Sequence, residues 1–63
     1  MGAIEREGYI FEMEYSEISK KGALHVYLNG ECIEEMPFHY TDDVPSHSKV
    51  EMLIDQFLES KQN

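Results

Sequence analysis

Three histidines, one cysteine and thirteen acidic residues are the side chains of this chain that could bind a metal or act in catalysis. Zinc sites usually show pairs of ligands at close spacing, such as C-x2-C or H-x3-H. His25, His39 and His47 form no such pair, and Cys32 approaches His25 only diagonally across a predicted hairpin. We therefore expect no metal site and no bound cofactor.

The remaining nucleophiles and acids do not indicate a catalytic site. Cys32 is the one candidate nucleophile near a base, His25, and the carboxylates around it disfavour a thiolate by like-charge repulsion. The pairs Glu34-Glu35 and Asp42-Asp43 are adjacent in the sequence, whereas acid-base catalysis needs two carboxylates that face one substrate. The four glycines are scattered and form no phosphate-binding loop. We expect no catalytic residues and no enzymatic activity.

The strongest structural signal is Asn29-Gly30, which stands between two apolar runs and predicts a two-residue β-turn. Such a turn sets the register of the two strands that it joins. The pairs expected across this hairpin are Leu28 with Glu31, Tyr27 with Cys32, Val26 with Ile33, and His25 with Glu34.

Residues 9–15 alternate with the period of two that is typical of a half-buried strand, which residues 5–7 could extend. Its core-facing side chains are Tyr9, Phe11, Met13 and Tyr15, and its opposite side carries Ile10, Glu12 and Glu14. Residues 16–22 break the alternation and are expected to form a loop, in which Ile18 either covers the core edge or adds a helical turn.

The second and third strands are expected at residues 23–28 and 31–38. Their core-facing residues are Leu24, Val26, Leu28 and Ile33. Strict alternation would also bury Glu35, so we predict a β-bulge near Glu34-Glu35 that turns both carboxylates outward and places Met36 and Phe38 inside. Pro37 lacks an N–H donor, which favours an edge position for the third strand.

A C-terminal amphipathic helix follows. Ser48-Lys49-Val50-Glu51 matches the S-x-x-E capping box, and Ser46 after Pro45 is an alternative first residue. The apolar stripe has the spacing i, i+3, i+4, i+7 and i+8, and comprises Val50, Leu53, Ile54, Phe57 and Leu58.

These elements predict a single α+β domain over residues 1–63, with a three-stranded antiparallel sheet in the order β-β-β-α and the helix packed on one face. No element remains to cover the other face of the sheet. We expect this face to be an interaction surface formed by Ile10, Glu12, Glu14, His25, Tyr27, Cys32 and Glu34.

Thirteen acidic and five basic residues give a net charge of −8, which argues against nucleic acid or an anionic membrane as a partner. No apolar run is long enough for a transmembrane helix, and the first residues lack a signal-peptide pattern, so we expect a cytoplasmic location. A core this small gains from self-association, and a single cysteine allows no internal disulfide.

The expected function is that of a small non-catalytic protein-interaction domain, with either itself, as a homodimer, or a basic protein as the partner. The alternative is an acidic regulator that imitates nucleic acid and blocks a basic surface on its target. In that alternative Glu12, Glu14, Glu34 and Glu35 would stand in for phosphates.

The chain from Met1-Gly2-Ala3-Ile4-Glu5 through Leu24–Gly30 to the terminal helix resembles the short uncharacterised acidic proteins of spore-forming Gram-positive bacteria. Those proteins form a family with a domain of unknown function. The resemblance therefore implies no activity, ligand or catalytic residue.

Overall fold

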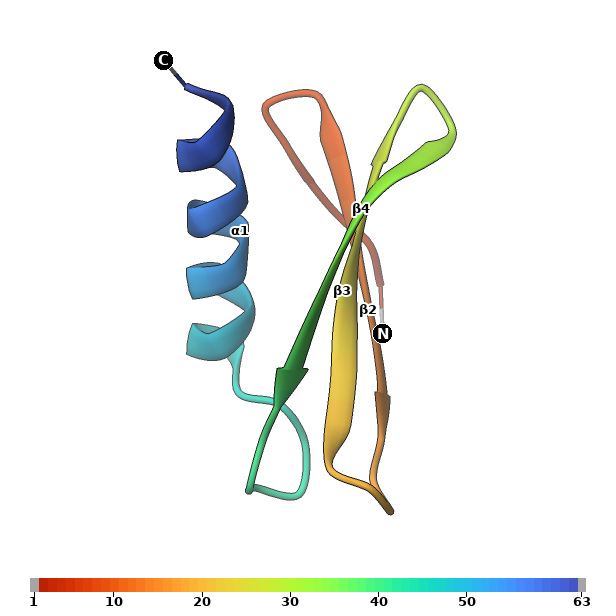
Figure 1. Ribbon diagram of the computed structural model, residues 1–63, viewed down its shortest axis with the longest axis vertical. Coiled ribbons are helices and arrows are strands. Elements are labelled where there is room, and N and C mark those ends of the chain that lie inside the picture. Colours follow the sequence, from red (N-terminus) through yellow and green to blue (C-terminus); the bar gives the residue numbers. More distant parts are fainter. Residues whose placement is uncertain (1, 63) are drawn as a thin grey trace.

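The computed structural model describes residues 2–62, which form four strands followed by one helix (Figure 1). The elements are β1 (Ile4–Arg6), β2 (Tyr9–Ser16), β3 (Lys21–Leu28), β4 (Glu31–His39) and α1 (His47–Lys61). The strands lie in the order β1-β2-β3-β4, and each neighbouring pair is antiparallel. The α+β class with one C-terminal helix is confirmed, whereas the expected number of three strands is wrong.

The additional strand arises from a tight turn at Glu7 and Gly8. Both residues have positive φ, 55° and 88°, as a type I′ hairpin turn requires. The turn pairs Arg6 with Tyr9 and folds β1 back along β2, so residues 5–7 do not extend the first long strand. Glutamate rarely adopts a positive φ, which is why the sequence pattern did not predict a turn here.

The predicted bulge is present, but it lies closer to the Asn29-Gly30 turn than expected. Tyr27 pairs with Cys32 as predicted, whereas Val26 pairs with Glu34, which leaves Ile33 as the extra residue. The expected pairs of Val26 with Ile33 and of His25 with Glu34 are therefore wrong. Ile33 is 41% exposed instead of lying in the core.

Beyond the bulge, β4 has the predicted orientation toward the core. Met36 lies opposite Leu24 and packs against the core, and Phe38 lies opposite Gly22 and is buried. A bulge at any position between Cys32 and Met36 would give this result, because one inserted residue exchanges the two faces of everything after it.

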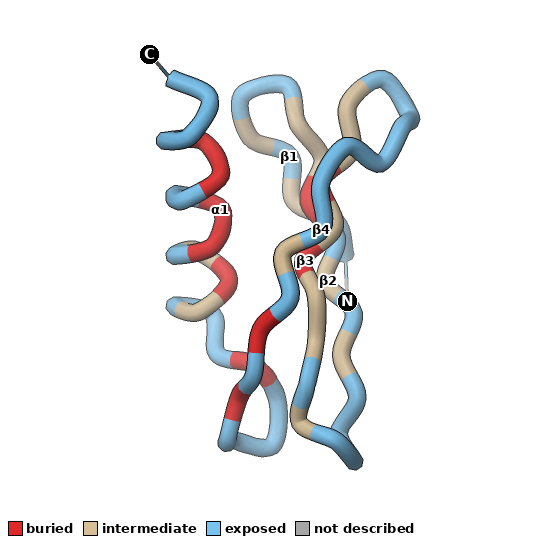
Figure 2. Tube along the Cα trace, viewed as in Figure 1, coloured by how far each residue is buried: buried red, intermediate tan, exposed pale blue. Residues whose placement is uncertain are grey.

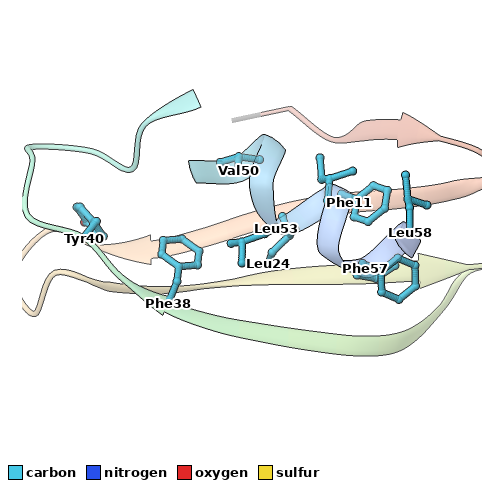
Figure 3. Packing of buried hydrophobic residues seen from close by; sticks show 10 residues of the cluster. Phe11, Leu24, Phe38, Tyr40, Val50, Leu53, Phe57 and Leu58 are labelled. Atoms are coloured by element: carbon cyan, nitrogen blue, oxygen red, sulfur yellow. The ribbon is translucent and has the colours of Figure 1, made fainter. Parts of the chain in front are cut away.

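The helix covers one face of the sheet with the predicted stripe (Figure 2). All five stripe residues are buried, and they pack on Phe11, Leu24, Val26, Phe38 and Tyr40. Figure 3 shows Phe57 beside Phe11, and their rings form an edge-to-face contact with centroids 5.7 Å apart. Leu28, expected in this core, is half-buried, and Ile18 at the tip of the β2–β3 loop is 98% exposed.

The N-cap of the helix is Ser46 and not Ser48. The Ser46 hydroxyl accepts a hydrogen bond from the backbone N–H of Lys49 at 3.1 Å, as an N-cap does. Glu51, the expected partner in a capping box with Ser48, instead accepts two hydrogen bonds from Arg6 of β1, at 2.6 and 3.1 Å. Glu51 is thus used in a contact with a distant part of the chain and not in the capping box that the sequence motif predicts.

Candidate interaction face on the outer side of the sheet

We use the term outer face for the side of the sheet that points away from α1. The observed register places all but one of the predicted interaction residues on it. They are Ile10, Glu12 and Glu14 of β2, His25 and Tyr27 of β3, and Cys32 of β4. No element in residues 2–62 covers this face, and Figure 1 shows α1 on the opposite side only.

Glu34 is the exception, and this expectation is corrected. The bulge at Ile33 places Glu34 opposite the buried Val26, on the helix side of the sheet, where it is exposed at the edge strand. Glu35 takes its place on the outer face, opposite His25. The predicted outward orientation is therefore correct for Glu35 and wrong for Glu34, because the face of each residue depends on the position of the bulge.

His25 stands at the centre of the outer face, on a strand with neighbours on both sides. Its Nε2 lies 3.4 Å from Oε1 of Glu14 on β2 and 3.5 Å from Oε2 of Glu35 on β4. The imidazole is mostly buried, with 20% of its side chain exposed, whereas both carboxylates are largely exposed. The contacts become ion pairs only when the imidazole is protonated.

The other imidazole nitrogen faces the thiol of Cys32. His25 Nδ1 lies 3.9 Å from Cys32 Sγ, and the thiol donates to the carbonyl oxygen of Glu34 at 3.6 Å. Cys32 is exposed and free. The thiol thus contacts both the imidazole of His25 and a backbone carbonyl at the bulge.

Tyr27 lies next to this group, between Ile10 on one strand and Cys32 on the other. Partial burial is the main cause that raises the pKa of its phenol above 10.0, and the negative charge of Glu12 adds to the effect. Tyr27 therefore remains neutral at physiological pH. It presents a rigid ring with a hydroxyl, which is a common centre of protein interfaces.

The carboxylates of the outer face do not form a metal site with the histidine. Within residues 2–62, no group of three or more His, Cys, Asp or Glu side chains is arranged to hold a metal ion. In the same part of the chain, α1 is too short and too polar to span a bilayer.

The helix side of the molecule contains an apolar cavity of about 400 Å³ that the sequence did not indicate. We call it the N-terminal cavity. Its lining includes Ile4 of β1, Met13 of β2, and Pro45 and Val50 at the start of α1. No sequence signal could have revealed it, because its walls come from four separate segments of the chain.

A four-stranded antiparallel meander with one helix on one face and an acidic, uncovered opposite face defines a two-layer α+β protein. The chain belongs to the family of unknown function DUF5370, whose model matches residues 1–63. It is 44% identical over 57 residues to the uncharacterised protein YbxH of Bacillus subtilis (strain 168), and the match covers 90% of each chain. No solved structure matches the chain. The resemblance to uncharacterised bacterial proteins is thus confirmed.

Proposed function

We propose that this protein is a non-catalytic binding domain whose outer face docks on a basic surface of a partner protein. The observation that carries the proposal is the composition of this uncovered face. Half-buried Ile10, His25 and Tyr27 form a central strip, and exposed Glu12 and Glu35 flank it.

This arrangement has the anatomy of a protein interface, with a semi-apolar centre and a charged rim. The ring of Tyr27 needs little ordering on binding, because it already packs between neighbouring strands. A net charge of −8 would accelerate the encounter with a basic partner and would make the encounter sensitive to salt.

A homodimer through the outer face is the less favoured form of the proposal. Two copies related by a twofold axis would bring the carboxylates of Glu12, Glu14 and Glu35 of both chains together. Like-charge contacts of this kind oppose association at low salt. Sedimentation equilibrium at low and high salt tests this form, since such a dimer should tighten as salt is added.

The acidic regulator is a second candidate, and the spacing of two carboxylates supports it. Glu12 and Glu14 lie two residues apart on the same side of β2, which separates their Cα atoms by roughly 7 Å. A regular row of charges can imitate a phosphate backbone. Displacement of a nucleic acid from the captured partner would distinguish this regulator from a simple binding domain.

The proposed location is the cytoplasm, where a reducing environment keeps an exposed thiol such as Cys32 free. The partner should be sought in a bacterial lysate with the immobilised protein, and the contact then mapped on the isotope-labelled chain by NMR. We expect the amide signals of the outer face to shift.

Two double variants, one on the outer face and one on α1, test where the partner docks, and each removes two negative charges. Glu12→Gln with Glu35→Gln should weaken binding of the captured partner at least tenfold. Asp55→Asn with Glu59→Gln, on the exposed side of α1, should change it less than twofold. Equal losses in both variants, or signal shifts confined to α1, would refute docking through the outer face.

A further inference from the structure

The two edges of the sheet differ in how well they are protected against an added strand. The outer edge of β4 carries Glu31 and Glu34, a bulge at Ile33, and Pro37. Among the described residues, acidic side chains occur at both edges of the sheet, but bulges and proline, which are among the usual means by which proteins prevent edge-to-edge pairing, occur only at this one. β4 is therefore a poor site for strand addition.

The opposite edge is only half covered. β1 pairs with Tyr9, Ile10 and Phe11 of β2, and β2 then continues to Ser16. Within residues 2–62, no strand pairs with residues 12–16 on the β1 side. Figure 1 shows β2 running past the end of β1 toward the lower end of the sheet. This stretch of β2 contains neither proline nor a bulge, so its edge is open to an added strand.

The geometry of the Glu7-Gly8 turn shows which backbone groups face the open edge. In a two-residue hairpin the residues that flank the turn, Arg6 and Tyr9, form a hydrogen-bonded pair, and every second residue repeats this orientation. Met13 and Tyr15 therefore direct their N–H and C=O groups away from β3. Consistent with this, the carbonyl oxygen of Glu14 points toward Gly22 on β3.

The N-terminal cavity lies directly beside this open stretch. Met13 is part of its lining, together with Pro45, Val50 and residues 2–4 of the N-terminal segment, so a strand added beside Met13 would displace residues 2 and 3. The volume of about 400 Å³ is within the range of sites that accept small apolar groups. An apolar side chain of a strand placed next to Met13 would point to this side of the sheet and could fill part of the cavity.

The other side of the same stretch is acidic. Glu12 and Glu14 alternate with Met13 and Tyr15, and both carboxylates are exposed on the outer face. Basic side chains of an added strand would be stabilised when they lie opposite these two carboxylates. The open edge thus selects for apolar residues on one side and basic residues on the other.

We propose that Met13–Ser16 of β2 binds an extended segment of a partner protein in which apolar and basic residues alternate, added as an antiparallel strand. This site differs from the docking surface proposed above, because it uses the backbone of β2 and the N-terminal cavity. Antiparallel pairing follows the pattern of the rest of the sheet.

A seven-residue peptide of alternating lysine and valine, acetylated and labelled with a fluorophore, tests the proposal by fluorescence anisotropy. In antiparallel pairing the valines lie opposite Met13 and Tyr15, and their N–H groups point at β2. N-methylation of the valines should weaken binding at least tenfold. N-methylation of the lysines, whose N–H groups point away, should change it less than threefold, and replacing lysine by glutamate should abolish it.

Equal effects of the two methylation patterns would overturn the proposal, and so would the absence of binding by the unmodified peptide. A concentration-dependent protection of the Met13 and Tyr15 amides without peptide would show that a second copy of the chain takes the edge, which would also overturn it. The variant Glu35→Gln, on the distant strand β4, should leave peptide binding unchanged, so this test is independent of docking through the outer face.

Discussion

The substitution Gly22→Ala tests the structure, because the general preference of strands for alanine and the close contacts at Gly22 predict stability changes of opposite sign. Glycine in a strand interior normally weakens it, so alanine at an unhindered position should stabilise the protein by about 0.5–1 kcal/mol. At Gly22 a Cβ atom would lie 2.7 Å from the carbonyl oxygen of Glu14 and 2.8 Å from Cζ of Phe38. The structure therefore predicts that Gly22→Ala is destabilising.

The size of the destabilisation depends on which groups must move to make room for the added methyl group. The ring of Phe38 is buried, and the Glu14 oxygen belongs to the backbone of β2, so neither can yield freely. Overpacking of this kind costs about 1–3 kcal/mol. The total stability of a chain of this length is roughly 3–9 kcal/mol, so the variant should lose a large part of it.

Urea denaturation followed by circular dichroism measures the effect as a lower midpoint with an unchanged slope. Gly2→Ala is the matched control, since a Cβ atom there meets nothing within 4 Å, and it should change stability by less than about 0.5 kcal/mol. A Gly22→Ala variant as stable as the wild type, or more so, would refute the close approach of β2, β3 and β4 at this point.

Further predictions concern the helix start, one ion pair and one phenol. Ser46→Ala should cost about 1 kcal/mol of unfolding free energy because it removes the N-cap, whereas Ser48→Ala should cost less than about 0.5 kcal/mol; thermal denaturation compares them. The hydrogen bonds from Arg6 hold the pKa of Glu51 below its ordinary 4.5, so this contact stabilises the fold above that pH and is lost as the pH falls below it. Glu51→Gln should accordingly flatten the acid limb of a stability–pH curve, and an unaltered limb would contradict the pairing. Partial burial raises the pKa of Tyr27, so Tyr27→Phe should remove a phenol that titrates above 10.0 in an ultraviolet titration of the folded protein.

Local patterns in the sequence were sufficient for the elements that depend on neighbours along the chain. The stripe from Val50 to Leu58 predicts α1 and its buried face, because helical period and burial are both set by spacing. The alternation from Tyr9 to Tyr15 likewise predicts which side of β2 meets the core. Asn29-Gly30 predicts its turn, since Asn and Gly accept the positive φ that the turn needs.

The candidate site was predicted only as far as these local patterns reach. Alternation within β2 and β3 places five of its seven residues on the outer face, and the register set by the Asn29-Gly30 turn adds Cys32 opposite Tyr27. The prediction that Glu34 lies on the outer face is wrong because a bulge lies between Glu34 and the turn. An inserted residue costs little in the backbone, so its position is decided by which side chains the rest of the fold can bury.

The sequence by itself determined the class of the fold, the helix and the acidic side of the sheet. The strand β1 is local but was missed because its turn needs a positive φ at Glu7, which glutamate rarely adopts. The tertiary structure alone decided the position of the bulge that turns Glu34 to the helix side, the pairing of Glu51 with Arg6 and the cavity beside Met13. The physical reason is that periodicity and turn chemistry act between residues near in the chain. The other features are energies of contact between distant segments, which exist only once the segments have packed together.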